Sequence, residues 1–316
     1  MNKVWNVRTY NENEVNEYID KLGISSVLAK LLIARNIPVE KANMYINPVI
    51  EGLYDPFLMR GMDKLVERIL EAKYKGEKVY IYGDYDVDGV TSITVMYCFL
   101  KEIGIDIHYY LPDRMEEGYG LNKGALQRIK EKGSTLVITV DCGISAIEEL
   151  KFAREIGLDV CVTDHHECGE KLPDAYVIVN PKQQDCKYPF KMLAGVGVAF
   201  KVVTAICKKL MLEDEKYLKY LDIVSLGTIA DIVPLIDENR IIAKHGIDSM
   251  QDIFIKENPR EGIKAILKIA GIKKADSSSI SFGVAPRINA SGRMADASIA
   301  VNMLIAKSEI EAMRIC

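Results

Sequence analysis

Short apolar runs alternate with helix-length segments through the middle of this 316-residue chain. Five runs have the length and the β-branched or aromatic content of buried strands: 78–83, 105–112, 135–140, 158–163 and 175–180. Helices are predicted at 90–104, 122–133 and 145–157. Continuously apolar strands separated by helices are typical of a parallel sheet covered on both faces. The predicted fold class is therefore α/β, a parallel β-sheet flanked by helices, followed from about residue 194 by additional helical segments.

The composition is that of a globular protein and argues against several other classes. Hydrophobic residues make up 49% of the chain and charged residues 27%, which is ordinary for a folded domain. The formal net charge of −4 gives no strongly basic signature. No apolar run approaches the roughly 18 residues of a membrane helix, and the seven cysteines contain no CxxC pair. We therefore expect a cytoplasmic protein with no membrane partner, disulfide framework or zinc ribbon.

Acidic and histidine residues come directly after three of the predicted strands. These residues are Asp84, Asp86 and Asp88 in GDYDVDG (83–89), Asp141 after 135–140, and Asp164, His165 and His166 after 158–163. Carboxylates this close together repel one another, and a bound cation reverses that cost. In open parallel sheets, ligands bind beyond the carboxyl ends of the strands. The convergence of three strand ends therefore predicts a metal site.

Each of these signals has a simpler alternative when it is taken alone. Asp141 could be a helix N-cap, and residues 164–166 could form a polar turn with a structural histidine. The alternating aspartates resemble a calcium loop, but an EF-hand needs a glutamate six residues beyond its glycine, and that position is Val95. Neighbouring residues of a strand point to opposite faces. Both histidines can therefore reach one site only if the strand has ended by Asp164.

The donor set indicates the metal and the class of reaction. Carboxylates with one or two imidazoles suit Mn²⁺ or Mg²⁺ better than an ion that prefers thiolates. The acidic residues are too many for one ion, which favours two ions bridged by a shared carboxylate. Two-metal sites hold the attacking and leaving oxygens of a phosphoryl displacement. The sequence therefore predicts two Mn²⁺ ions, with Mg²⁺ as the alternative, and hydrolysis of phosphoesters.

Six motifs in order resemble those of the DHH phosphoesterase superfamily and its RecJ-like branch. They are GDYDVDG (83–89), TVDCGIS (139–145), VTDHHE (162–167), LAGVGVAFK (193–201), SLGTIADIVPL (225–235) and PRINASGRM (286–294). RecJ-like proteins are single-strand-specific 5′→3′ DNA exonucleases. The resemblance therefore implies a manganese-dependent enzyme that hydrolyses single-stranded DNA in recombination and repair, with a single-strand-binding protein and a helicase as candidate partners.

The resemblance also implies a role for each site residue. One ion would be held by Asp84, Asp86 and Asp141, and the other by Asp88, Asp141, His165 and Asp231, which makes Asp141 the bridging ligand. His166 would face the scissile phosphate, and Asp164 would orient its neighbours. Asp231 enters only through the resemblance, because TIADIV alone is typical of a helix end. Small-substrate members of the superfamily typically carry a histidine where this chain has Tyr82, so Asp84 would supply the missing ligand.

Substrate contacts are predicted in two motifs. PRINASGRM joins two arginines to small residues, which suits the approach of an anionic strand. The resemblance assigns substrate binding here to Arg287, Asn289, Ser291 and Arg293. RMEEGYGLN (114–122) offers Tyr119 as a stacking platform, or alternatively as a buried turn residue. GVGVAFK (195–201) matches neither a Walker A loop nor a dinucleotide fingerprint, and we interpret it as a tight helix start whose amides could also meet a phosphate.

The predicted organisation has three parts. A helical segment packed on the core covers residues 1–60, the phosphoesterase domain covers 61–294, and the start of a linker helix covers 295–316. RecJ-like chains continue past this helix into a DHH-associated domain, so the chain is expected to be a fragment. Two other functions stay open at this point: a phosphodiesterase of short oligonucleotides or cyclic dinucleotides, and a non-catalytic DNA-binding scaffold.

Overall fold

The computed structural model describes residues 7–112, 117–118, 120–294 and 298–316, and the chain divides into two compact units, 1–53 and 54–316. The first unit contains helices α1 (Glu12–Leu22), α2 (Ser26–Ala34), α3 (Val39–Ile46) and the 3₁₀ turn η1 (Ile50–Gly52). Asn11 caps α1 by accepting a hydrogen bond from the Asn13 amide, and Gly23 ends it with φ of 65°. The division falls before the predicted boundary at residue 60, and the packing of this segment on the core stays a prediction.

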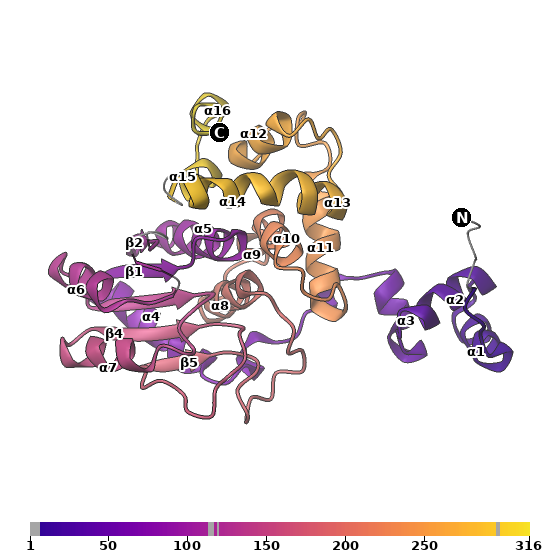
Figure 1. Cartoon of the computed structure of the whole chain (residues 1–316), viewed down its shortest axis with the longest axis horizontal. Coiled ribbons are helices and arrows are strands. Elements are labelled where there is room, and N and C mark those ends of the chain that lie inside the picture. The colour runs from indigo at the N-terminus through magenta and orange to yellow at the C-terminus, as the bar shows by residue number, and fades with distance from the viewer. Residues whose placement is uncertain (1–6, 113–116, 119, 295–297) are drawn as a thin grey trace, which may run out of the picture. The chain divides into compact units, whose positions relative to one another are not determined.

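A five-stranded parallel sheet forms the centre of the second unit and confirms the predicted fold class. Its strands are β1 (Lys78–Gly83), β2 (Asp106–Tyr110), β3 (Leu136–Val140), β4 (Asp159–Thr163) and β5 (Val177–Val179). They lie in the order β2-β1-β3-β4-β5, with every neighbouring pair parallel (Figure 1). The strand order reverses between β1 and β3. In open sheets of this kind, ligands bind beyond the strand ends at that switch point.

Helices cover both faces of the sheet, as the continuous apolar strands predict. On one face, α6 (Lys123–Glu131) and α7 (Ile147–Glu155) share a buried apolar cluster with Tyr80, Tyr82 and Val137. The other layer contains α4 (Met62–Lys75), α5 (Val87–Glu102) and α8 (Gly195–Lys209), which pack on the strands and on one another (Figure 1). Helix α5 begins three residues before its predicted start, because Asp86 caps it.

Further helices complete the second unit. They are η2 (Pro56–Leu58), α9 (Glu215–Leu218), α10 (Leu221–Ala230), α11 (Asp237–Met250), α12 (Glu261–Ile269), α13 (Ser277–Ser279), the π-turn η3 (Ile280–Val284), α14 (Ala285–Met294), α15 (Ser298–Leu304) and α16 (Glu309–Ile315). Helix α10 packs against α5 and α8, and α11 packs against α10. The linker helix predicted from residue 295 is interrupted: α15 and α16 are separated by a break at 305–308.

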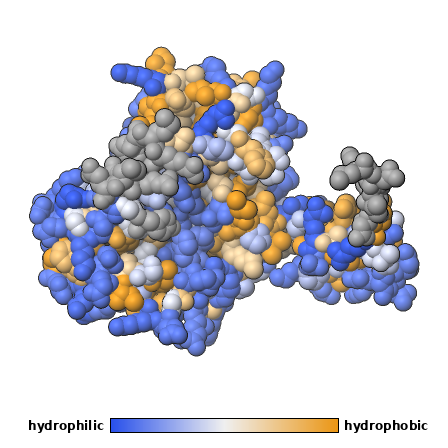
Figure 2. Space-filling model, in the orientation of Figure 1, coloured by the Kyte–Doolittle hydropathy of each residue, from blue (hydrophilic) through white to orange (hydrophobic). Residues whose placement is uncertain are grey.

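The surface agrees with the composition. On the face drawn in Figure 2, hydrophilic side chains predominate around the sheet and its flanking helices α6 and α7. None of the described helices combines the length and the hydrophobicity needed to span a bilayer. All seven cysteines are free thiols, as the absence of paired spacing predicts.

Candidate metal centre

The loop after β1 brings the three alternating aspartates into one compact turn. Asp86 accepts a hydrogen bond from the Gly89 amide at 2.9 Å and thereby starts α5, and Asp88 lies buried in the first turn of that helix. Asp84 is fully buried and accepts from the Tyr85 amide at 2.7 Å. Only glycine fits at 89, because a Cβ there would lie 2.3 Å from the Asp84 carbonyl oxygen. The glycine that closes the motif therefore allows the helix to begin immediately beside Asp84.

Asp141 directly follows β3 in a strained backbone conformation. Its φ is 58°, a region that residues other than glycine adopt rarely. The Thr139 hydroxyl stabilises the turn by donating to the Cys142 carbonyl at 2.8 Å. Gly195 packs against the Asp141 side chain so closely that a Cβ would lie 2.5 Å from Oδ1. That oxygen is buried and accepts no hydrogen bond among the described residues. Strain of this kind persists where the surrounding structure holds a functional group in place.

The two histidines follow β4, which ends at Thr163, so the condition set for both of them to reach one site is met. Asp164 Oδ1 accepts from the backbone amides of His165 at 2.7 Å and His166 at 3.1 Å, and it lies 2.7 Å from His166 Nδ1. Its Oδ2 accepts from the Ile144 amide at 2.9 Å. Burial alone would raise the pKa of Asp164, but its hydrogen bonds with His166 and Ile144, together with the charge of His166, outweigh burial and lower it. These contacts fit the predicted orienting role.

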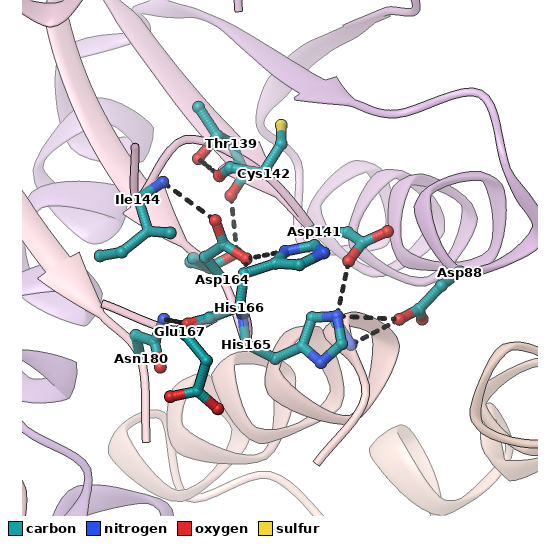
Figure 3. Close-up of polar contacts among 12 residues, drawn as sticks. Asp88, Thr139, Asp141, Cys142, Ile144, Asp164, His165, His166, Glu167 and Asn180 are labelled. Atoms are coloured by element: carbon teal, nitrogen blue, oxygen red, sulfur yellow. Dashed lines mark hydrogen bonds and ion pairs between the residues drawn. The ribbon is translucent and has the colours of Figure 1, made fainter. Parts of the chain in front are cut away.

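Acidic residues from three other segments approach the His165 ring, and Figure 3 shows two of them, Asp88 and Asp141, beside it. His165 Nε2 lies 3.1 Å from Asp141 Oδ1, 3.8 Å from Asp88 Oδ2 and 3.8 Å from Asp231 Oδ2. Two groups have donor atoms within 4.8 Å of one another: Asp141, His165 and His166, and Asp88, His165 and Asp231. Asp231, at the C-terminal end of α10, is therefore part of the cluster, although the local sequence gives no sign of it.

The electrostatics of the cluster fit a bound divalent cation. Burial raises the pKa of Asp88 and of Asp231 to about 7, and burial together with the charge of Asp88 raises the pKa of Asp141 well above its usual value. A cation would favour the ionised form of all three side chains. Oδ1 of Asp141 is buried, accepts no hydrogen bond among the described residues and lies 3.1 Å from His165 Nε2. Carboxylate oxygens and imidazole nitrogens are ligand atoms that Mn²⁺ and Mg²⁺ accept. The residues present therefore fit such an ion.

Asp84 and Asp86 belong to neither of the two groups found among the described residues. Asp86 is near enough to raise the pKa of both Asp88 and Asp141 by its charge. The set of Asp84, Asp86 and Asp141 inferred for one ion therefore stays a prediction.

The amino-terminal end of α8 contacts the metal centre in a way that the sequence did not reveal. The predicted helix start at Gly195 is confirmed. The amides of Gly195 and Val196 donate to the two carboxylate oxygens of Asp88 at 2.6 and 2.8 Å. These amides therefore bind a carboxylate of the chain itself and not the phosphate that the sequence suggested as an alternative. The signal available in the sequence was the pair of glycines in GVG (195–197), which permit this close approach.

The predicted substrate-binding residues lie on α14, apart from Tyr119. Arg287 is exposed and donates to the Gly283 carbonyl at 2.6 Å, and the Ser291 hydroxyl donates to Ile288. Arg287 and Ser291 line a cavity of about 380 Å³ whose other walls are mainly apolar. Asn289 is half-buried. Tyr119 and the side chain of Arg293 lie outside the described residues. The positions of these residues do not show whether any of them binds substrate, so their substrate roles stay predictions.

The position that distinguishes small-substrate members of the superfamily lies away from the cluster. Tyr82 is fully buried, and its hydroxyl donates to the Gly120 carbonyl at 2.9 Å. The side-chain amide of Asn122 donates to the same hydroxyl at 3.2 Å. Tyr82 therefore packs under the loop that follows β2 and belongs to neither group of potential metal ligands.

Comparisons with known proteins agree with this geometry. The sequence profile described as "DHH family, N-terminal domain" matches residues 78–228. The single-stranded-DNA-specific exonuclease RecJ of Bacillus subtilis (strain 168) is 44% identical over 311 residues, which are 98% of this chain and 38% of that protein. RecJ of Thermus thermophilus in complex with Mn²⁺ has a TM-score of 0.80 at 28% identity, covering 98% of this chain and 43% of that chain. Its complex with Mg²⁺ has a TM-score of 0.72 at 25% identity, covering 98% of this chain and 40% of that chain.

The chain thus spans less than half the length of these relatives. The region matched by the profile begins at the first residue of β1 and ends within α10. It contains Asp88, Asp141, His165 and His166, and Asp231 follows it by three residues. The resemblance predicted from the motifs is confirmed, and this chain belongs to the DHH family.

Proposed function

We propose that this chain is the hydrolytic core of a RecJ-like, single-strand-specific 5′→3′ DNA exonuclease that requires divalent metal ions. The observation that carries the proposal is the meeting of Asp88, Asp141, His165 and Asp231 at one edge of the sheet, with Asp141 Oδ1 unbonded among the described residues. Two buried carboxylates and one half-buried carboxylate around one imidazole favour added positive charge. The similarity to RecJ over 98% of the chain supports the same class of reaction.

We propose two ions that share Asp141, as the resemblance to the family implies. Asp88, Asp141, His165 and Asp231 would hold one of them, because all three carboxylates approach His165 Nε2 within 3.8 Å. Asp84 and Asp86 would join Asp141 at the other. We propose Mn²⁺ as the working metal and Mg²⁺ as the alternative, since the Thermus relative binds each. These residues would hold the ions where such a pair would supply an activated water and stabilisation of charge on the leaving oxygen.

His166 is proposed to contact the scissile phosphate. Its hydrogen bond with Asp164 fixes Nδ1 and raises the pKa of the ring, so His166 holds a proton more firmly than an ordinary histidine. The opposite nitrogen, Nε2, is then a cationic donor suited to a phosphate oxygen. Its side chain is 46% exposed, whereas that of His165 is 9% exposed. This difference supports a substrate contact for His166 and a metal contact for His165.

A cavity of about 370 Å³ beside His166 is a suitable place for a nucleotide. Its walls come from the loops that follow β2, β3 and β4 and include Leu121, Ile144 and Glu167. From this cavity, the single-stranded DNA would continue toward the predicted contacts on α14. In the part of the chain that the structure describes, three of the eight basic residues in 254–294 form ion pairs: Arg260 with Asp222, and Lys264 and Lys268 with Glu309. Arg287 and Arg293, which the resemblance assigns to substrate binding, are our candidates for phosphate contacts.

This substrate class suggests a biological setting. We propose that the protein acts in DNA recombination and repair in the cytoplasm, with a single-strand-binding protein and a helicase as partners. These proposals rest on the similarity to RecJ, of which the chain spans less than half.

The direct test compares substrates and metals in one assay. Single strands labelled at the 5′ or the 3′ end, a blunt duplex and a dinucleotide are each incubated with Mn²⁺, Mg²⁺ or EDTA. We expect mononucleotides from the 5′ end of the single strand with Mn²⁺, little cleavage of the duplex and none in EDTA. Asp141→Ala serves as the inactive control.

Two results would overturn the proposal. Cleavage confined to the dinucleotide would identify a phosphodiesterase of short oligonucleotides. Binding of the single strand without hydrolysis, whatever the metal, would identify a non-catalytic scaffold.

A further inference from the structure

We propose that Asn239 is a positioning residue that fixes the distance between two metal ligands, Asp88 and Asp231, without contacting metal or substrate. This inference rests on the proposed function, because it concerns ligands of the proposed ion. Asn239 lies in the first turn of α11 and is fully buried. Its side-chain nitrogen donates to two backbone carbonyls, Met192 at 2.5 Å and Pro234 at 3.1 Å. One amide group thus joins two loops that are far apart in the sequence.

The first loop leads directly to the support of Asp88. Met192 lies three residues before Gly195, where α8 begins. The amides of Gly195 and Val196 hold both carboxylate oxygens of Asp88 at 2.6 and 2.8 Å. The first turn of α8 has little freedom, since Gly195 also packs against the side chain of Asp141. A shift of the Met192 carbonyl would therefore move the amides that orient Asp88.

The second loop leads directly away from Asp231. Pro234 lies three residues after Asp231. Ile232, which lies in the turn between them, has φ of 60° and is 87% exposed. A β-branched residue in this conformation is strained, and an exposed side chain has no packing to compensate for it. The Pro234 carbonyl also accepts from the Ile236 amide at 2.9 Å. Two hydrogen bonds to one carbonyl thus hold the strained turn, and Asn239 supplies the one that comes from α11.

The first turn of α11 is itself held rigidly. Glu238, the neighbour of Asn239, is fully buried and contacts Lys201 Nζ at 2.5 Å, the Tyr188 hydroxyl at 2.5 Å and the Tyr54 amide at 2.8 Å. Lys201 belongs to α8, so α11 is tied to α8 at a second place. Buried charges paired in this way resist displacement, since separating them leaves an uncompensated charge. Asn239 therefore extends from a fixed support to both loops.

The test uses Asn239→Leu, which keeps the volume and removes the donor, and Asn239→Ser as a second variant should the first fail to fold. Hydrogen exchange of the metal-free chain is followed in peptides covering 190–197 and 229–236. We expect exchange about tenfold faster in both peptides and unchanged in β1 and β3. Titration calorimetry with MnCl₂ should show Mn²⁺ binding weakened by about 10–100-fold, the usual cost of losing a group that orients ligands.

Arg68→Met is the matched control. Arg68 is buried at the opposite end of the sheet, so its loss destabilises the fold without touching either loop. We expect this variant to keep the parental Mn²⁺ affinity. Equal weakening of Mn²⁺ binding in Arg68→Met and Asn239→Leu, or parental exchange and affinity in the Asn239 variants, would overturn the inference. A parent chain that binds no Mn²⁺ would instead overturn the proposed function, and with it the link to metal ligands. The exchange data alone would then decide whether Asn239 holds the two loops.

Discussion

The two ends of the sheet carry buried charges in opposite arrangements. At the amino end, Arg68 of α4 donates to Glu77 at 2.7 Å and to Asp159 at 2.9 Å. These partners raise the pKa of Arg68 against its burial, and hydrogen bonds from Thr135 and Arg68 lower the pKa of Glu77 despite its burial. At the carboxyl end, Asp88, Asp141 and Asp231 face one another across His165, and the pKa of each carboxyl is raised.

The difference identifies which end needs a ligand. At the amino end, Arg68 pairs with two carboxylates inside the chain, and breaking this buried cluster would leave uncompensated charge. The charges at the carboxyl end are alike in sign, and they lower the stability of the fold until a cation arrives. The same fold thus separates a structural ion-pair cluster from a functional one by placing them at opposite strand ends. The following predictions test that separation.

The largest effect is expected for Asp141→Ala. Removing the proposed shared ligand should lower the rate of DNA hydrolysis by about 1,000-fold or more, which corresponds to several kcal/mol of lost transition-state stabilisation. The metal-free variant should be more stable than its parent, because the charge crowding at the carboxyl end is relieved. Calorimetry with MnCl₂ and thermal unfolding in EDTA measure the two effects. A variant that binds two ions and retains near-normal turnover would show that Asp141 is not the bridging ligand.

Arg68→Met should have the reverse pattern. It leaves Glu77 and Asp159 without their cation, and we expect a loss of about 3 kcal/mol in the free energy of unfolding, within the range for breaking a buried pair. Urea unfolding measures this loss. Mn²⁺ affinity should not change, because the metal centre lies at the other strand ends. An affinity that falls together with stability would mean that the two ends are coupled and that the comparison fails.

The pH dependence of the metal-free chain should show the charge crowding directly. The raised pKa values of Asp88, Asp141 and Asp231 mean that the folded chain binds more protons than the unfolded chain, so stability is lost as pH rises from about 4 to above 7. His166 acts in the same direction and His165 in the opposite one. We therefore expect a melting temperature several degrees higher at about pH 5.5 than at about pH 7.5 in EDTA.

Two controls make this result specific to the carboxyl end. Saturation with Mn²⁺ should remove most of the dependence. Asp141→Asn should remove only the part that Asp141 contributes, because burial is the main cause of the raised pKa values of Asp88 and Asp231. The amino end should not contribute, because the stability from the lowered pKa of Glu77 is present above the ordinary glutamate range and is lost only at lower pH. A flat profile in EDTA would mean that the three carboxyls do not share one crowded environment.

Local sequence patterns predicted the sheet and the edge at which the acidic and histidine residues meet. This was possible because strand ends are encoded locally: Asp141 directly follows β3, and Asp164 directly follows β4. The same rule did not reveal Asp231, which ends a helix and reaches the cluster only through the packing of α10 on α5 and α8. Only the resemblance to a family supplied it.

Contacts between distant segments were also beyond the sequence. Asp88 meets the amides of α8 across more than 100 residues, and Arg68 meets Asp159 across 91. Neither the hydrophobic periodicity nor the spacing of motifs in the sequence predicts such long-range contacts. The positive φ of Asp141 is likewise a tertiary effect, since nothing in TVDCGIS requires it. The roles inferred for Asp84 and Asp86 depend on a bound ion and stay predictions.

The smallest effect is expected for Arg287→Ala. This variant tests whether Arg287 helps a protein with an acidic site to bind negatively charged DNA. If Arg287 contacts one DNA phosphate, its loss should make the slope of log affinity against log salt shallower by about 0.7 and weaken all sequences about equally, because a backbone contact reads no bases. Lys75→Ala is the control: it removes an exposed positive charge that pairs with Glu71 on α4, the helix that carries Arg68. Its slope should equal that of the parent. Binding is measured in Mn²⁺ with a non-cleavable single strand over a salt series. Equal slopes for all three proteins would remove Arg287 from the DNA path and leave Arg293 as the motif's remaining arginine to test.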